Sequence, residues 1–199
     1  MTIETKARIG EFFLESVEAA CKNQRVDASQ VAQAYVAGLL EDFVRPDAHG
    51  TLRETLDRSL TLVLDEAMQL APGERFERLK GLGDGTLYVS GFFGEHLERR
   101  GVDDGFVASI GGYAYRSAAS MLRPGAAAGS GFGDLFRELA ERFAVLVEVI
   151  AEIAERTTLA SRSPAGTLRL YEKWLRTGNE RLGRELAAHG LAPLKPGLA

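Results

Sequence analysis

Apolar residues recur at helical spacing along almost the whole 199-residue chain, and the alternation typical of strands is scarce. The clearest pattern covers residues 132–153, where apolar side chains repeat every three or four positions. It comprises Phe132, Phe136, Leu139, Phe143, Leu146, Ile150 and Ile153. Three heptads of this kind predict one helix with an apolar seam.

The N-terminal half contains four further helical patterns. A first helix is predicted over residues 3–22, and its apolar face is formed by Ile9, Phe12, Phe13, Val17, Ala20 and Cys21. The second begins at an Asp27 N-cap and carries a row of Val31, Tyr35, Leu39 and Phe43. The third spans 51–70 from a Thr51 capping box, and Pro72 opens the fourth.

Glycine and aspartate residues mark the boundaries of the central helices. The run Gly-Leu-Gly-Asp-Gly at 81–85 predicts a turn, with Asp84 capping a helix over 86–100. Asp103 and Asp104 start another helix over 104–122, whose apolar row includes Phe106, Ile110, Tyr113 and Met121. Two short helices follow near the C-terminus, the last one carrying Leu182 and Leu186.

Together these patterns predict an all-α fold, a single-domain helical bundle of about eight or nine helices over residues 1–199. Residues 123–133 are rich in glycine and alanine and form the best candidate for an internal linker. Residues 193–199 are expected to be a loose tail.

Composition excludes several classes of protein. Hydrophobic residues make up 45% and charged residues 26%, as in ordinary globular domains. The formal net charge of −4 leaves no general footprint for nucleic acid, although the basic stretch 162–199 could attract an acidic partner. There is no apolar run long enough to cross a membrane and no signal-peptide pattern, so a cytoplasmic location is expected by elimination.

The residue types that carry most catalytic chemistry are sparse. One cysteine, Cys21, allows no internal disulfide, and His49, His96 and His189 lack the spacing of metal ligands. The sequence contains no nucleophile elbow and no nucleotide-binding fingerprint. We therefore expect no metal and no cofactor, and we expect the protein not to be an enzyme. If the protein were an enzyme, its catalytic groups would have to come from polar residues far apart in the sequence, namely Glu148, His96, Tyr113 and Arg116.

A stripe of glutamates follows the helix predicted over 132–153. Glu141, Glu148, Glu152 and Glu155 share one face, which is expected to be solvated. Glu148 differs from the others because apolar residues flank it on both sides. If it were buried, its pKa would rise and it would need a partner.

Small and aromatic residues are interleaved over 83–120. Glycine is costly inside a helix, so its repeated use implies either close helix packing or room for a ligand. Helix packing is the commoner cause. The alternative is a small apolar or aromatic ligand bound between helices 86–100 and 104–122, for which the candidates are Tyr88, Gly91, Phe92, His96, Tyr113 and Arg116.

The leading functional hypothesis is a non-enzymatic interaction or regulatory protein that self-associates, with a homodimer as its simplest form. The heptad seam is the candidate interface, through Phe136, Leu139, Phe143, Leu146, Ile150 and Ile153. A seam of this length serves a dimer or an internal core equally well, so the sequence leaves that choice open.

Overall fold

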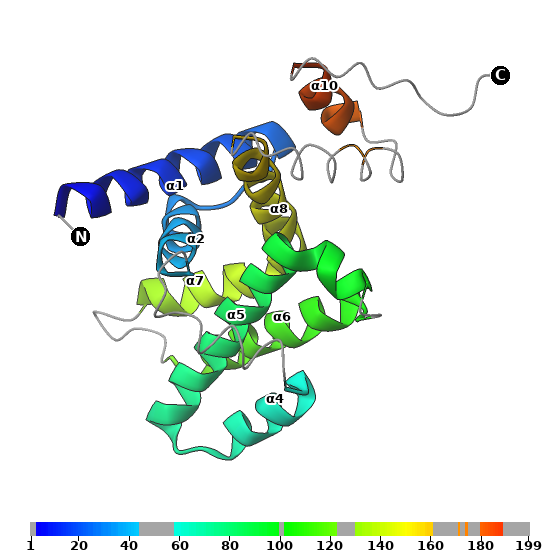
Figure 1. Cartoon of the computed structure of the whole chain (residues 1–199). Coiled ribbons are helices and arrows are strands. Elements are labelled where there is room, and N and C mark those ends of the chain that lie inside the picture. The colour runs from blue at the N-terminus through cyan, green and yellow to red at the C-terminus, as the bar shows by residue number, and fades with distance from the viewer. Residues whose placement is uncertain are drawn as a thin grey trace. The chain divides into compact units, whose positions relative to one another are not determined.

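The computed structural model describes residues 3–43, 58–99, 102–122, 130–160, 171, 174 and 180–188. Every regular element in these ranges is an α-helix, which confirms the predicted all-α bundle (Figure 1). None of the described helices combines the length and apolar character that a membrane span requires. Contacts divide the chain into two units, residues 1–152 and residues 153–199.

The first two helices pack against each other. Helix α1 spans Ile3–Gln24 and α2 spans Gln30–Phe43. The N-cap of α2 is Ser29, whose Oγ accepts a hydrogen bond from the Ala32 amide at 3.1 Å. The predicted Asp27 cap is therefore wrong by two residues, and the Asp27 side chain is fully exposed. Glu138 fixes Ser29 by accepting hydrogen bonds from its amide (2.7 Å) and its hydroxyl (2.6 Å).

Two residues predicted to face the core of this pair are exposed. Phe12 is 53% exposed and Val31 is 59% exposed. The buried side of α1 is centred on Phe13 and Val17, and Phe12 lies about 100° around the helix from Phe13. On α2, Ala32 and not Val31 enters the core, so the buried row is shifted by one residue at its start.

The third predicted helix is shorter than the pattern suggested. Helix α4 spans Leu60–Gln69, and Ser59 at its N-cap has extended backbone, so one helix over 51–70 is wrong. Residues 44–57 lie outside the described part of the chain. Helix α5 spans Pro72–Arg99, which confirms Pro72 as its first residue.

Helix α5 continues through the predicted turn at 81–85, so that turn is a wrong prediction. The only interruption is at Phe93, whose φ of −124° and ψ of 18° kink the helix. Helix α6 spans Asp104–Met121, and its N-cap is Asp103, as predicted. The Asp103 carboxylate accepts a hydrogen bond from the Phe106 amide at 2.9 Å.

The predicted heptad helix is two helices. Helix α7 spans Ser130–Glu141 and α8 spans Phe143–Ala160, with a turn at Arg142 between them. The Arg142 amide still bonds to the Glu138 carbonyl, and the Leu146 amide bonds to the Arg142 carbonyl. Helical hydrogen bonding therefore continues across the turn, which explains why the heptad spacing gives no sign of it. Residues 130–133 of the predicted linker are helical, and 123–129 lie outside the described residues.

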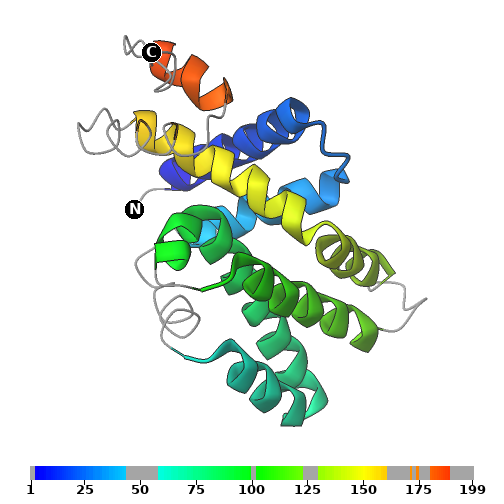
Figure 2. The same cartoon turned by 90° about the vertical axis from the view of Figure 1, so that its right-hand side faces the viewer.

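Helices α5 and α6 lie side by side and antiparallel at the centre of residues 1–152 (Figure 2). A Cβ added to Gly83 would stand 2.6 Å from the Tyr115 ring. One added to Gly111 would stand 2.3 Å from the Phe143 ring. Glycine is required at these positions because the helices leave no space for a methyl group.

The described residues of 153–199 contain a small hydrophobic cluster. Helix α10 spans Glu180–Ala188 and buries Leu182 and Leu186 against Trp174, as the apolar pair on the last predicted helix suggested. Tyr171 packs on Trp174 with ring centroids 5.9 Å apart. The predicted tail at 193–199 lies outside the described residues.

Candidate interaction surface

Asp84 lies in the middle of α5, and its carboxylate joins three helices. Its Oδ1 accepts hydrogen bonds from the hydroxyls of Tyr35 on α2 (2.6 Å) and Tyr115 on α6 (2.7 Å). Its Oδ2 accepts one from the Lys80 ammonium at 2.8 Å. The predicted role of Asp84 as an N-cap is therefore wrong. Its carboxylate instead links α2, α5 and α6 through hydrogen bonds.

The chemistry of this cluster does not favour catalysis. Burial first, and then the neighbouring Asp84 charge, raise the pKa of Tyr35 and of Tyr115 well above the usual tyrosine value. A phenolate is consequently disfavoured here, and neither tyrosine is poised to accept a proton near neutral pH.

Unfolding at high pH should report on these two tyrosines. Because their folded-state pKa is raised, their contribution is complete below about pH 10 and is lost as the pH rises above it. Each should add a slope of about 1.4 kcal/mol per pH unit to the fall in unfolding free energy. Urea titrations at several pH values measure that slope. Tyr115→Phe should reduce it and the exposed Tyr113→Phe should not; equal slopes in both variants would contradict the assignment.

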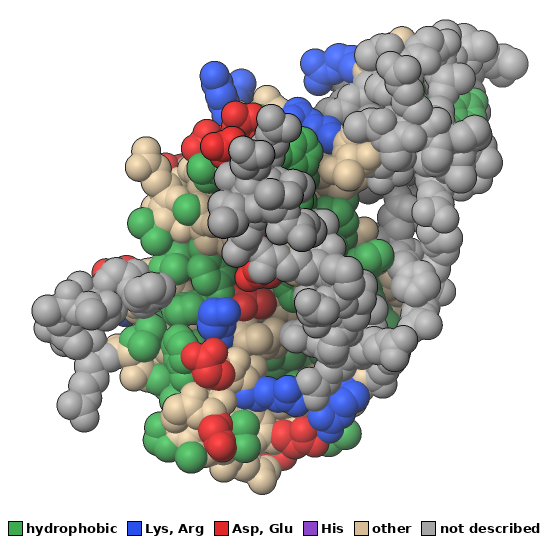
Figure 3. Space-filling view, turned by 60° about the vertical axis from the view of Figure 1, so that its left-hand side comes forward, with side chains coloured by type: hydrophobic (Ala, Val, Ile, Leu, Met, Phe, Trp, Pro, Cys, Tyr) green, Lys and Arg blue, Asp and Glu red, His purple; other side chains and the backbone are tan. Residues whose placement is uncertain are grey.

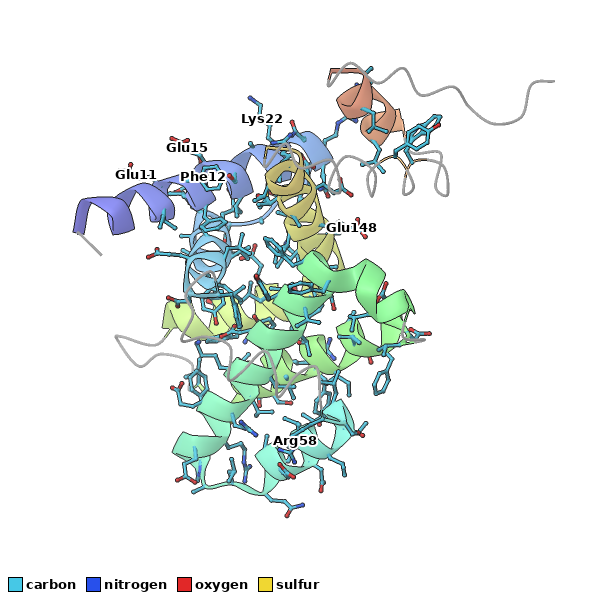
Figure 4. All side chains as sticks on the ribbon, viewed as in Figure 1. Glu11, Phe12, Glu15, Lys22, Arg58 and Glu148 are labelled. Carbon is cyan, nitrogen blue, oxygen red and sulfur yellow. The ribbon has the colours of Figure 1, made fainter. Side chains whose placement is uncertain are left out.

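A second buried carboxylate joins α1 to α8. Glu152 is 0% exposed, and its two oxygens accept hydrogen bonds from the side-chain amides of Asn23 (2.9 Å) and Gln24 (2.8 Å). Burial and the charge of Glu152 raise the pKa of the Cys21 thiol, so Cys21 is an inert buried thiol and not a nucleophile. The expectation that this glutamate stripe is solvated is therefore wrong for Glu152, whereas Glu148 is exposed on the outer side of α8 (Figure 4).

The predicted ligand-binding residues do not share one site. Tyr88 and Gly91 are buried inside the bundle: Tyr88 stacks on Phe43 of α2 at 4.5 Å, and a Cβ on Gly91 would stand 2.4 Å from Ile150 of α8. Phe92 is half-buried and stacks on Tyr88 at 4.8 Å.

The other three candidates lie elsewhere. Tyr113 and Arg116 are exposed on the side of α6 away from α5, and the side chain of His96 lies outside the described residues. A ligand between the two helices stays a prediction, but the small residues that suggested it are occupied by helix packing at Gly83, Gly91 and Gly111.

The six predicted interface residues are all buried. The most exposed of them is Phe143, at 3%, in a set that comprises Phe136, Leu139, Phe143, Leu146, Ile150 and Ile153. Phe136 and Phe143 contact the Tyr115 ring, at centroid distances of 5.8 and 6.0 Å. In the folded chain the seam therefore serves as core, and a second copy would need another surface.

The outer face of α6 offers such a surface. Phe106 is 44% exposed and Tyr113 is 46% exposed, although the sequence placed both in the core row with Ile110. The side chains that α6 buries include Val107, Ala114, Tyr115 and Ala118. We call the exposed row the α6 outer row; it has the 3-4-3-4 spacing of heptad a and d positions and consists of Phe106, Ser109, Tyr113, Arg116 and Ser120.

A surface hollow of about 800 Å³ lies between the C-terminal end of α4 and the first turns of α5. Four of the six residues that line it are charged, namely Glu66, Glu74, Glu77 and Arg78, and the other two are Leu70 and Gly73. Acidic and basic side chains mix on the lower part of Figure 3, at the height of these helices. Such a lining does not suit the apolar or aromatic ligand that the sequence suggested.

Metal chemistry finds no support in the described residues, where no group of three histidine, cysteine, aspartate or glutamate side chains is placed to hold an ion. His49 and His189 lie outside those residues. Comparison with known proteins adds no further constraint: no protein family, no curated protein and no solved structure matches this chain.

Proposed function

We propose that this protein is a non-enzymatic interaction protein that self-associates through the outer row of α6. The observation that carries the proposal is the exposure of two aromatic side chains, Phe106 and Tyr113, seven residues apart on one helix face. Aromatic residues and arginine are the types that concentrate binding energy at protein interfaces. Arg116 stands one turn beyond Tyr113 in the same row.

The inner side of α6 gives this row a rigid support. Gly111, Ala114 and Tyr115 are fully packed, and the Asp84 carboxylate holds the Tyr115 hydroxyl in place. Because the backbone of this helix is already fixed, only its exposed side chains lose freedom when a partner binds, which favours association.

The outward face of α1 is a weaker candidate. Figure 4 shows Glu11, Phe12 and Glu15 on the side of α1 that points away from α2. Glu18 and Lys22 continue the exposed stripe. A face with three glutamates repels a second copy of itself and is typical of a solvated helix surface. Phe12 is the exposed aromatic residue of that face, and its ring packs edge-on against Phe13 at 5.4 Å; it supplies a control for the α6 row.

An enzymatic function has less support. Its suggested actors are dispersed, with Glu148 exposed on α8 and Tyr113 and Arg116 on the outside of α6. The buried carboxylates Asp84 and Glu152 are engaged with side chains that join helices. A cytoplasmic location remains part of the proposal on the sequence grounds given above.

The mass of the protein in solution tests this function. Light scattering across a concentration series from about 1 to 100 µM should show a rise from the 21.6 kDa monomer towards twice that mass. A fixed monomer mass over the whole range would overturn the proposal. An alanine substitution at Phe12 should leave the rise unchanged, because that side chain is outside the α6 row.

A further inference from the structure

We infer that two copies of the chain pair through α6 in one antiparallel register, centred between Ser109 and Ile110, with Phe106 of each copy facing Tyr113 of the other. The inference rests on the proposed self-association and specifies its geometry. A twofold interface requires that if one residue faces a second, the second also faces the first. Phe106 and Tyr113 are equally far from that centre along the helix, so they meet this condition.

Charge along the row favours the same register. Asp103 and Arg116 are also equally far from the centre, so each acid would face the arginine of the other copy. Within the described residues, no carboxylate forms an ion pair with Arg116. The guanidinium is thus available to a partner.

A parallel pairing would reverse this complementarity. Each residue would then face its own copy, which places Asp103 against Asp103 and Arg116 against Arg116. Like charges opposed across an interface destabilise it and exclude that arrangement in favour of the complementary one. Over residues 103–116 this face carries an acid, an aromatic residue, a small residue, a second aromatic residue and a base, and this order specifies the direction of the pairing as well as its register.

The residue at the centre of the proposed register suits a helix crossing. Ser109 is small, and its hydroxyl donates a hydrogen bond to the Phe106 carbonyl at 2.7 Å. Because this hydroxyl is already bonded within its own helix, covering it leaves no unpaired donor. A small residue also allows two helix axes to approach closely, so the aromatic rings on either side can meet.

The size of the surface sets the strength of the contact. Helix α6 has 18 residues and is about 27 Å long. One helix face of that length buries less than the roughly 800 Å² per partner of a standard stable interface. The dimer should therefore be weak and reversible, with a dissociation constant in the micromolar range or above.

Two single-cysteine additions test the register with closely matched chemistry. Ser109 and Ser120 are both exposed on the outer row, and each hydroxyl donates to the carbonyl three residues earlier, at 2.7 and 2.6 Å. A Ser109→Cys variant should form a cross-linked dimer with a short thiol-reactive reagent. Ser120→Cys should not, since the two copies of residue 120 would lie about 30 Å apart in this register. The buried Cys21 is common to both variants.

The alternatives give different patterns. Equal cross-linking at 109 and 120 would indicate a parallel pair and overturn the inference. A dimer by mass that cross-links at neither position would place the contact on another surface, which also overturns the register but leaves the proposed self-association standing. A monomer by mass would remove both.

A charge substitution provides an independent readout. Asp103→Asn removes the charge but keeps an N-cap side chain of equal quality, so α6 should remain folded. It should weaken the dimer about threefold or more at low salt and have no effect at high salt, where the pair is screened. The same weakening at both salt concentrations would contradict an ion pair with Arg116.

Discussion

Gly111→Ala is expected to lower the free energy of unfolding by about 2–3 kcal/mol, whereas Gly112→Ala should raise it slightly. A Cβ on Gly111 would stand 2.3 Å from the Phe143 ring and 2.4 Å from the Thr86 hydroxyl oxygen. Both neighbours are buried, so the helices must separate to accept it. A Cβ on Gly112 would meet the Ala140 carbonyl oxygen at 3.5 Å, an ordinary contact.

The two glycines make a closely matched pair. Both lie in the interior of α6, so each substitution brings the same gain of up to about 1 kcal/mol in helix propensity. Urea unfolding monitored by circular dichroism gives the two free energies directly. Equal effects at 111 and 112 would show that α5 and α6 are not packed as closely as the structure has them.

Asp84→Ala is the second large effect, an expected loss of about 3 kcal/mol. The substitution leaves the Tyr115 hydroxyl buried without its acceptor and also removes the partner of Tyr35 and Lys80. A buried donor with no acceptor costs more than the hydrogen bond itself contributed, because its desolvation is no longer compensated.

Two comparisons make that result specific. Asp84→Asn keeps an oxygen for the tyrosines and should cost about 1 kcal/mol. Asp134→Ala removes an exposed aspartate that pairs with Arg137 at 2.8 Å and should change stability by less than about 0.5 kcal/mol. The same chemical unfolding experiment serves all three variants. If Asp84→Ala lowered the free energy of unfolding as little as Asp134→Ala does, the Asp84 carboxylate would not be holding the helices together.

The elements predicted well are those marked by local chemistry. Pro72 opens α5 and Asp103 caps α6 because the ring geometry of proline and the short carboxylate of aspartate act on their own backbone. The run at 81–85 misled the prediction because glycine fits both a turn and a tight helix contact. At Gly83 the helix contact is the actual reason, because the Tyr115 ring, some thirty residues away in the sequence, occupies the space of a Cβ atom.

The candidate surface could not be identified from residue type alone. Phe106 and Tyr113 are the largest apolar residues on their side of α6, so the periodic pattern assigned them to the core. The buried side instead contains Gly111, Ala114 and Ala118. Because these residues are small, α5 and α7 can pack closely against α6. In a helix that packs through small residues, the aromatic row can be the outer one.

We expect the outer row of α6 to join two copies of the chain. Sedimentation velocity of a Phe106→Ala, Tyr113→Ala double variant, run beside Phe12→Ala and the unsubstituted protein, measures this association. Both add alanine, a strong helix former, at exposed helical positions. The double variant should raise the dissociation constant at least tenfold, while Phe12→Ala should match the unsubstituted protein. Equal dissociation constants for all three proteins would contradict it.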